Sequence, residues 1–204
     1  MISNDESVLD IGCDHGHLAQ QLRHNGNRAH LICSDNKIGP LNNARKNLAG
    51  YENISFVLGN GAEKVTGSVD TVVMSGLGYQ TVTGIIEASR EYFAKCERMI
   101  IQINTLHDKL RCWLMKNGYM IADEKMIRDY GYYYQIMDIR KGEQALSKME
   151  MTYGPVLLRK REAVFLDYLK DQIAKKKEIL KQIDETNSDH QKIVEKIAEM
   201  ESLL

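Results

Sequence analysis

The stretch Val8-Leu-Asp-Ile-Gly-Cys-Asp-His-Gly16 decides the fold of this 204-residue chain. A short, mostly apolar run is followed at once by a loop with a glycine at each end, Gly12 and Gly16. A buried strand that runs directly into such a loop and then into a helix is typical of the first unit of a doubly wound α/β sheet. The stretch therefore predicts a cofactor site at the carboxyl end of the first strand.

Apolar runs and helix-like stretches alternate along the next hundred residues. Further buried strands are expected at 29–33, 54–58, 71–74 and 99–103, with helices at 17–25, 39–48, 80–92 and 106–116. After Gly118 the pattern changes to two strands, 119–127 and 132–139, around a turn at 129–131. This order predicts a mostly parallel sheet with right-handed crossovers, ended by a hairpin.

The last fifty residues form a charged, helical tail beyond Tyr153-Gly-Pro155. A run of poor helix formers at 186–189, with a capping box from Ser188 to Gln191, predicts a break in this tail. We expect an α/β domain over residues 1–154 and a helical coiled-coil hairpin over 155–204, with one continuous helix as the alternative. The stripe that carries this prediction is Leu166, Leu169, Ile173, Leu180, Ile183, Val194, Ile197 and Leu204.

Composition limits the class of protein. With 43% apolar residues, two prolines and a net charge of −1, the chain is expected to fold throughout, and its overall charge demands no anionic partner. The four cysteines form no Cys-x-x-Cys pair and follow no secretory leader, which indicates a reduced, cytoplasmic protein. We expect no membrane, because no apolar run approaches the roughly 20 residues that span a bilayer. No metal is expected either, since Cys13, His15 and His17 match no standard zinc spacing.

The loop after the first strand discriminates between cofactors. A dinucleotide site has a second glycine where this chain has Asp14, and a carboxylate there would repel a pyrophosphate but attract the α-amino group of S-adenosylmethionine. Asp10 adds to this acidic setting, and Asp35, 25 residues further on, can accept hydrogen bonds from both ribose hydroxyls. The alternative is that these residues merely end strands. We predict S-adenosylmethionine, with a site completed by Gly12, Gly16, Asn60 and Gly61.

The motifs resemble those of the bacterial tRNA (adenine-22-N1)-methyltransferase family. The family's Asp-Ile-Gly-Ser-Asp-His loop matches Asp10-Ile-Gly-Cys-Asp-His15. Its Ala-Gly-Met-Gly and Gln-Pro-Asn match Ser75-Gly-Leu-Gly78 and Gln102-Ile-Asn104, although Tyr79 replaces a second glycine and Ile103 the proline. The match runs nearly end to end, through Gly59-Asn-Gly61, Leu110-Arg-Cys-Trp-Leu114, Asn117-Gly-Tyr119 and Tyr153-Gly-Pro155.

The resemblance implies a class I Rossmann-like methyltransferase with a seven-stranded sheet and a helical tail, acting on N1 of an adenine in tRNA. It adds His15 and Ser75 to the cofactor site. It places Gly76 and Tyr79 at the wall of the target-base site, Gln102 and Asn104 at the base edge, and Tyr134 in contact with the base. The alternatives are packing of Tyr79 on the following helix and ordinary loop capping by the two amides. Most of the tyrosine cluster at 130–134 is expected to pack within the hairpin.

The tail has a basic half and an acidic half. Residues 159–181 carry eight Lys or Arg against four acids, whereas 182–204 carry two against six. The alternative to RNA binding is mutual attraction of the two helical arms, and a monomer or weak dimer is expected. The residues predicted to bind tRNA phosphates are Arg159, Lys160, Arg161, Lys175, Lys176 and Lys177.

Two other functions stay open at this point. A methyltransferase of the same fold that acts on a small molecule or a protein would leave the basic half of the tail unexplained. An inactive, cofactor-binding RNA module is suggested by Tyr79.

Overall fold

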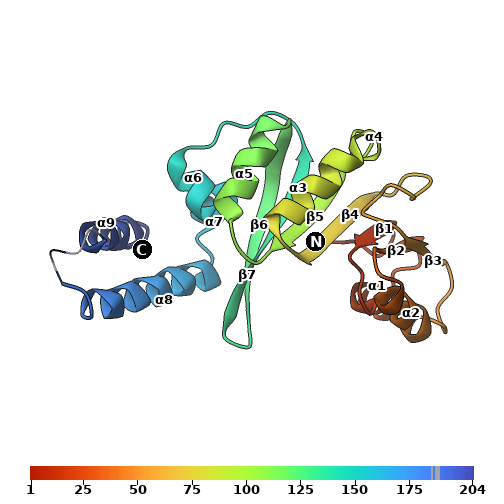
Figure 1. Ribbon diagram of the computed structural model, residues 1–204, viewed down its shortest axis with the longest axis horizontal. Helices are drawn as coiled ribbons and strands as arrows, with labels where there is room; N and C mark the ends of the chain where they lie inside the picture. Colours follow the sequence, from red (N-terminus) through yellow and green to blue (C-terminus); the bar gives the residue numbers. More distant parts are fainter. Residues whose placement is uncertain (185, 187–188) are drawn as a thin grey trace.

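The computed structural model describes residues 1–184, 186 and 189–204. Its strands are β1 (Val8–Ile11), β2 (Leu31–Asp35), β3 (Ile54–Leu58), β4 (Thr71–Leu77), β5 (Arg98–Ile103), β6 (Tyr119–Asp129) and β7 (Tyr132–Lys141). They form one sheet in the order β3-β2-β1-β4-β5-β7-β6 (Figure 1). The first five strands are parallel, and β7 runs antiparallel to both β5 and β6. The predicted mostly parallel, seven-stranded sheet is confirmed.

Helices cover both faces of this sheet. Helices α1 (His17–His24) and α2 (Ile38–Asn47) pack on one face, over a core that includes Val8, Cys33 and Ile100. Helices α3 (Tyr79–Ala88), α4 (Arg90–Phe93) and α5 (His107–Lys116) cover the other face, over a core that includes Leu9 and Ile101. Neighbouring strand residues point to opposite faces and both faces are buried, so the strands read as continuous apolar runs.

Most elements differ from their predicted bounds by a few residues, and for two of them the contacts show the reason. The helix expected over 80–92 divides at Ser89, whose carbonyl accepts hydrogen bonds from the amides of Tyr92 and Phe93. This turn lets Phe93 be fully buried. Strand β2 begins two residues later than expected, because the Arg23 guanidinium donates to the carbonyls of Asn27 and Ala29 and holds the chain in a loop.

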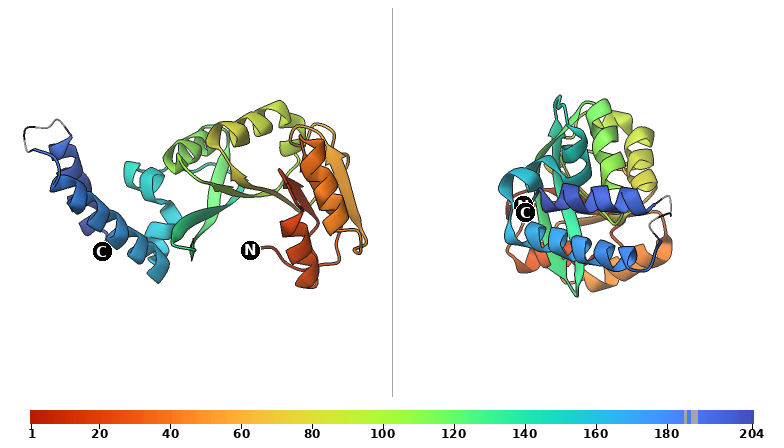
Figure 2. Two further views of the ribbon diagram at one scale, coloured as in Figure 1. Left: turned by 60° about the horizontal axis from the view of Figure 1, so that its bottom comes forward. Right: turned by 90° about the vertical axis from the view of Figure 1, so that its left-hand side faces the viewer.

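Helix α6 (Lys148–Tyr153) precedes the tail, whose described residues form α7 (Pro155–Lys160), α8 (Ala163–Leu180) and α9 (His190–Glu201). Helices α8 and α9 lie side by side, at the end of the molecule opposite to α1 and α2 (Figure 2). They share a core with Leu169, Ile173 and Ile197. The tail is thus a hairpin and not one continuous helix. The capping box expected from Ser188 lies outside the described residues, and the expected boundary at 154/155 falls between α6 and α7.

A buried ion pair ties the tail to the sheet. The side chains of Arg111 on α5 and Glu124 on β6 are 0% and 1% exposed, with Arg111 Nη2 and Glu124 Oε1 2.8 Å apart. Glu124 Oε2 also accepts from the backbone amide of Val156, in the first turn of α7. Arg111 donates in addition to the carbonyl of Met151 on α6 and to Gln135 on β7. Helices α6 and α7 are therefore fixed against β6 and β7.

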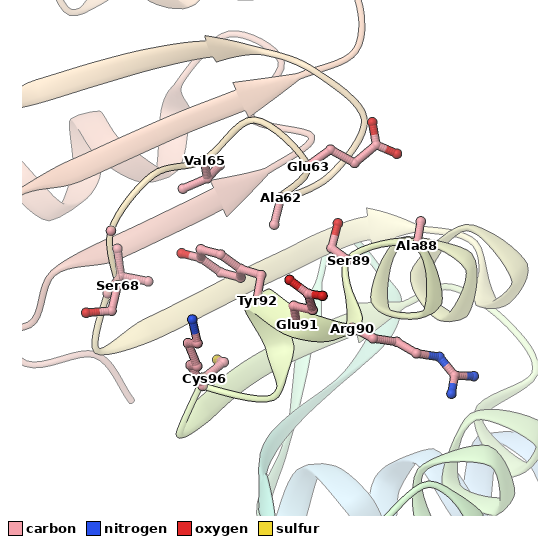
Figure 3. Close-up of a pocket in the computed structure, with 13 residues that line it drawn as sticks. Ala62, Glu63, Val65, Ser68, Ala88, Ser89, Arg90, Glu91, Tyr92 and Cys96 are labelled. Carbon is pink, nitrogen blue, oxygen red and sulfur yellow. The ribbon is translucent and has the colours of Figure 1, made fainter.

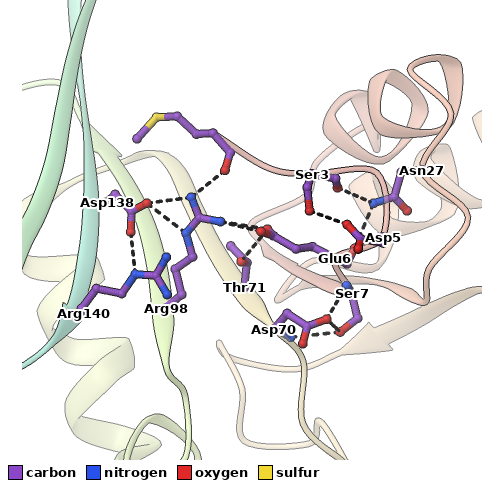
Figure 4. Close-up of polar contacts among 11 residues, drawn as sticks. Ser3, Asp5, Glu6, Ser7, Asn27, Asp70, Thr71, Arg98, Asp138 and Arg140 are labelled. Atoms are coloured by element: carbon purple, nitrogen blue, oxygen red, sulfur yellow. Dashed lines mark hydrogen bonds and ion pairs between the residues drawn. The ribbon is translucent and has the colours of Figure 1, made fainter.

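The amino edge of the sheet is joined by a second polar network (Figure 4). Arg98, at the start of β5, donates to Glu6 at 2.8 Å and to Asp138 at 2.6 Å. The amide of Ser7 donates to Asp70, just before β4, at 2.7 Å. Charged groups at this edge bond to one another, whereas the predicted cofactor residues lie at the opposite, carboxyl edge.

Candidate functional site

A cleft of about 240 Å³ opens at the carboxyl edge of the sheet, where the strand order reverses between β1 and β4. In open α/β sheets this reversal is the usual place for a ligand. The loops after β1, β2 and β3 all contribute to the cleft. The predicted cofactor residues that line it are Gly12, Asp14, Asp35, Asn60 and Gly61.

Glycines let the walls of the cleft approach one another closely. Gly12 and Gly61 have φ values of +76° and +67°, which favour glycine. A Cβ atom on Gly61 would lie 2.5 Å from Cγ2 of Ile85. Gly16 also has a positive φ, but a Cβ there would meet Leu48, which directly follows α2, at 2.7 Å, and Gly16 does not line the cleft. Gly16 thus permits packing between the first loop and α2.

The backbone amides of the first loop are engaged within the protein. Gly12 and Cys13 donate to the carbonyl of Ser34 at 2.8 and 3.1 Å, and Asp14 donates to Oδ2 of Asp35 at 3.2 Å. A pyrophosphate would need such amides as donors. The loop instead presents the exposed carboxylate of Asp14, which suits a ligand with an ammonium group. The structure therefore fits S-adenosylmethionine better than a dinucleotide.

Two buried acids lie at the strand ends. Asp35 Oδ1 accepts from the amide of Lys37 at 2.9 Å, and each of its oxygens can accept a further hydrogen bond, as two ribose hydroxyls would require. Asp10 lies behind the cleft wall and does not line the cleft. Burial and, secondarily, the nearby charge of Asp35 raise the pKa of Asp10 to about 7. The cofactor end of the sheet thus holds buried groups of like charge.

Other lining residues escaped the sequence reasoning. Leu77 and Ile85 add apolar walls to the cleft, and Thr81 lies between them in the chain. An apolar residue in a strand or helix carries no sequence signal that separates a cleft wall from the core. Besides Asp10 and Gly16, the predicted cofactor residues His15 and Ser75 are not in the lining, although His15 lies 3.6 Å from the Asp14 carboxylate.

Beside the cleft, four residues predicted on the family resemblance form one hydrogen-bonded group. Gln102 Oε1 accepts from the amide of Gly76 at 2.7 Å and from the hydroxyl of Ser75 at 3.1 Å. Gln102 Nε2 donates to Oδ1 of Asn104 at 3.0 Å. Both ends of the Gln102 side chain are therefore engaged, and they join the end of β4, where a loop was expected, to the residue that follows β5. Asn104 is exposed and retains its amide hydrogens for a ligand.

The predicted aromatic residues occupy different environments. Tyr79 is the first residue of α3, half-buried, and packs against the main core. Tyr134 is half-buried on β7, two residues before Ile136, which pairs with Gln102. The expectation that most of the tyrosine cluster packs within the hairpin is wrong for Tyr130 and Tyr132, which are 92% and 70% exposed. They lie at the tip of the hairpin, where no neighbouring strand covers them.

The predicted RNA-binding residues lie on α8 and around α7, and three of them have partners within the chain. Lys160 pairs with Asp123 at 2.7 Å, and Lys177 pairs with Glu201 at 2.6 Å. Arg161 donates to the carbonyl of Leu204. The Lys177 pair joins the two arms, as the alternative interpretation requires. Exposed pairs of this kind contribute only about 0–1 kcal/mol, so they do not prevent contact with phosphates.

A larger cavity, of about 820 Å³, lies elsewhere (Figure 3). It is bounded by the segment after β3 and by Ser89, Tyr92 and other residues around α4. The hydroxyls of Ser89 and Tyr92 are buried without a partner, and burial raises the pKa of Tyr92 to about 12. None of the residues lining this cavity is a predicted site residue, so the chemistry is assigned to the smaller cleft.

Within residues 1–184, 186 and 189–204, His, Cys, Asp and Glu residues form no group of three or more that could hold a metal ion. None of the helices in the same part of the chain combines the length and the apolar character needed to cross a membrane.

The strand order, the cleft at its reversal point and an acidic loop with engaged amides define the class of protein. It is a Rossmann-like methyltransferase. A family model described as tRNA (adenine(22)-N(1))-methyltransferase, TrmK, matches residues 8–202. The chain belongs to this family, and the resemblance seen in its motifs is confirmed.

Known relatives match nearly the whole chain. The tRNA (adenine(22)-N(1))-methyltransferase of Bacillus subtilis is 27% identical over 215 residues, which cover 99% of this chain and 90% of that protein. M. capricolum TrmK, solved with S-adenosyl-homocysteine, has a TM-score of 0.81 at 28% identity and covers 99% and 92% of the two chains. A Streptococcus pneumoniae protein solved with S-adenosyl-L-methionine has a TM-score of 0.86 at 28% identity, with 99% and 94% covered.

Proposed function

We propose that this chain transfers the methyl group of S-adenosylmethionine to N1 of adenine 22 in tRNA. The observation that carries the proposal is the first loop of a TrmK family member, whose amides are engaged and whose Asp14 carboxylate lines the cleft together with that of Asp35, at the end of β2. Relatives with the same fold were solved with S-adenosyl-L-methionine and with its product. The position on the tRNA follows from the description of the family.

The cleft residues hold the cofactor by complementary chemistry. Asp35 accepts the ribose hydroxyls, Asp14 attracts the ammonium group, and Asn60 pairs with the edge of the adenine ring. Leu77 and Ile85 supply apolar contacts to the faces of that ring. Asp10 and Gly16 are buried and support this arrangement from behind, while His15 and Ser75 lie nearer the surface beside the residues that line the cleft. When bound, S-adenosylmethionine supplies a methyl group already activated on its sulfonium.

The target adenine is placed by the residues beside the cleft. Its neutral N1 takes the methyl group, so the protein needs no general base and acts by orientation and by exclusion of water. The proton that the positively charged product loses leaves in a later step. Gln102 fixes Gly76 at the wall between the two sites, and Asn104 donates to the base edge. Tyr134 and Tyr79 contact the face of the base, as aromatic residues do in RNA sites.

The basic half of the tail contributes general affinity for RNA. Lys175 is exposed on α8, and Arg159 is exposed on α7. With Lys160, Arg161, Lys176 and Lys177 they form two basic groups that contact tRNA phosphates, each contact adding to the salt dependence of binding. A cytoplasmic location and a monomer or weak dimer stay predictions.

The test is incubation with unmodified bulk tRNA and radiolabelled S-adenosylmethionine, followed by nucleoside analysis. Label in N1-methyladenosine supports the proposal. Cofactor binding without label in RNA would favour a small-molecule or protein substrate, or an inactive module. If no S-adenosylmethionine binds at millimolar concentration, each of these functions fails.

A further inference from the structure

The β6–β7 hairpin extends beyond the carboxyl edge of the sheet. Gln102 on β5 pairs with Ile136, whereas β7 begins four residues earlier, at Tyr132. Because a strand advances about 3.4 Å per residue, the hairpin reaches about 14 Å past Gln102. Figure 1 shows it projecting past the ends of β4 and β5. We call residues 125–134 the finger.

One face of the finger is braced against the tail. The Tyr133 hydroxyl donates to Oδ2 of Asp171 on α8 at 2.6 Å, and the Tyr133 ring lies edge-on to Tyr168 at 5.3 Å. The guanidinium of Arg128 lies 5.2 Å from the centre of the Tyr133 ring. Met126, on the same face, belongs to the core that α8 and α9 share. The tail thus holds the finger in place where it projects from the carboxyl edge of the sheet.

The opposite face carries an exposed aromatic track with one basic residue, Lys125, and one acidic residue, Asp129, which pairs with Tyr132. Because side chains alternate along a strand, Tyr132 and Tyr134 share the face of Ile136 and its partner Gln102. Lys125 pairs with Ile136 across the hairpin and is exposed. The track runs from the target-base site through Tyr134 to Tyr132, which is 70% exposed.

The tip of the finger has an aromatic residue where the fold does not need one. The turn uses Tyr130 at φ +44° and Gly131 at φ +84°. Both values are positive, as in the two-residue hairpin turns that favour Asn-Gly, and an aromatic side chain is disfavoured at such a φ. Tyr130 is nevertheless present and is 92% exposed. Neither packing nor turn geometry accounts for Tyr130 or Tyr132, so a ligand is their simplest explanation.

We infer that the exposed face of the finger is a second tRNA contact, which stacks on bases next to the target adenine; this rests on the proposed function. An adenine must leave its stack to be methylated at N1, and this exposes its neighbours. Aromatic faces hold unstacked bases without sequence preference, as Tyr132 and Tyr130 would, and Lys125 pairs with a phosphate. RNA is the partner, because the track starts at the site that receives the target base.

The experiment compares Tyr132→Ala, Tyr132→Phe and Lys125→Gln in the full chain. The matched control is Lys95→Gln, at an exposed residue between α4 and β5. Tyr132→Ala raises KM for tRNA by about tenfold, because one stacked base loses its platform. Tyr132→Phe keeps the ring and retains the parent KM. Lys125→Gln lowers the salt slope of tRNA binding by about one. The dissociation constant of S-adenosylmethionine does not change in any variant.

The outcomes separate this inference from the function on which it rests. If the parent methylates tRNA and Tyr132→Ala keeps its KM and its affinity for tRNA, the finger is not an RNA contact. If Tyr132→Phe is as impaired as Tyr132→Ala, stacking is not the role of this residue. If the parent neither binds nor methylates tRNA, the inference and the proposed function fail together.

Discussion

Two buried polar centres of this molecule differ in their charges: one pairs opposite charges, and the other brings like charges together. At the junction with the tail, Arg111 and Glu124 are paired at 2.8 Å and bonded to surrounding backbone and amide groups. At the cofactor end of the sheet, Asp10 and Asp35 are both buried, and they have the same sign. The first centre holds the structure together. The second keeps acceptors ready for a ligand at the expense of stability, which is the usual sign of a functional site.

Loss of one partner at the junction gives the largest expected effect. Arg111→Leu leaves Glu124 buried and unpaired, so the free energy of unfolding falls by about 3–5 kcal/mol. Urea denaturation measures this change. The double variant Arg111→Leu/Glu124→Leu recovers most of the loss, since an apolar pair of similar size needs no counter-charge. Equal stability of the single and double variants would contradict a structural ion pair.

At the cofactor end of the sheet, removal of a charge is expected to stabilise the protein, which is the opposite of its effect at the junction. Asp10 has a pKa of about 7 in the folded chain and 3.8 when unfolded, so only the folded state keeps its proton between these values. The free energy of unfolding of the parent, measured relative to that of Asp10→Asn, therefore falls as the pH rises from about 4 to 7. Above pH 7 it stays constant, and the total fall is on the order of a few kcal/mol. Urea denaturation of both proteins at several pH values tests this, and a pH-independent difference would contradict the burial of a like-charged pair.

A substitution of Asp35 is expected to affect cofactor binding and not folding. Asp35→Asn removes the charge and one acceptor, so S-adenosylmethionine binds about tenfold more weakly, by isothermal titration calorimetry. Asp70→Asn at the amino edge is the matched control, because Asp70 bonds to Ser7 and is far from the cleft. If both variants bind the cofactor equally well, Asp35 is not a ribose ligand.

The tail is expected to show the smallest effect. Lys175→Gln removes one exposed charge and lowers the salt slope of tRNA binding by about one, with only a few-fold loss of affinity. Lys95→Gln, which removes an exposed charge beside α4, leaves tRNA binding unchanged. If Lys175→Gln leaves the salt slope of tRNA binding unaltered, this part of the tail has a structural role only.

Helices and strands whose apolar residues follow a clear pattern were predictable from the sequence. The five parallel strands and the hairpin follow from apolar runs and turn residues, because such runs must be buried on a sheet. The division at Ser89 was not predictable, since it depends on burial of Phe93 in a core that forms only in three dimensions. The same holds for Arg111 and Glu124, whose pairing needs the sheet and the tail together.

The candidate site was predictable where chemistry marks it. Asp14, Asp35, Gly12 and Gly61 line the cleft as expected, because acids and glycines that follow strands form a recognisable sequence pattern. Leu77 and Ile85 were missed, since an apolar wall looks like core. The exposure of Tyr130 and Tyr132 was also missed, because alternation gives the face of a strand residue but not the length by which a hairpin outruns its sheet.

The most direct test uses two tRNA transcripts that differ only at position 22, one with adenosine and one with guanosine. Each is incubated with the protein and labelled S-adenosylmethionine, and the nucleosides are separated. The account predicts N1-methyladenosine in the adenosine-22 transcript and no label in the other. Equal labelling of both transcripts, or none in either, would contradict it.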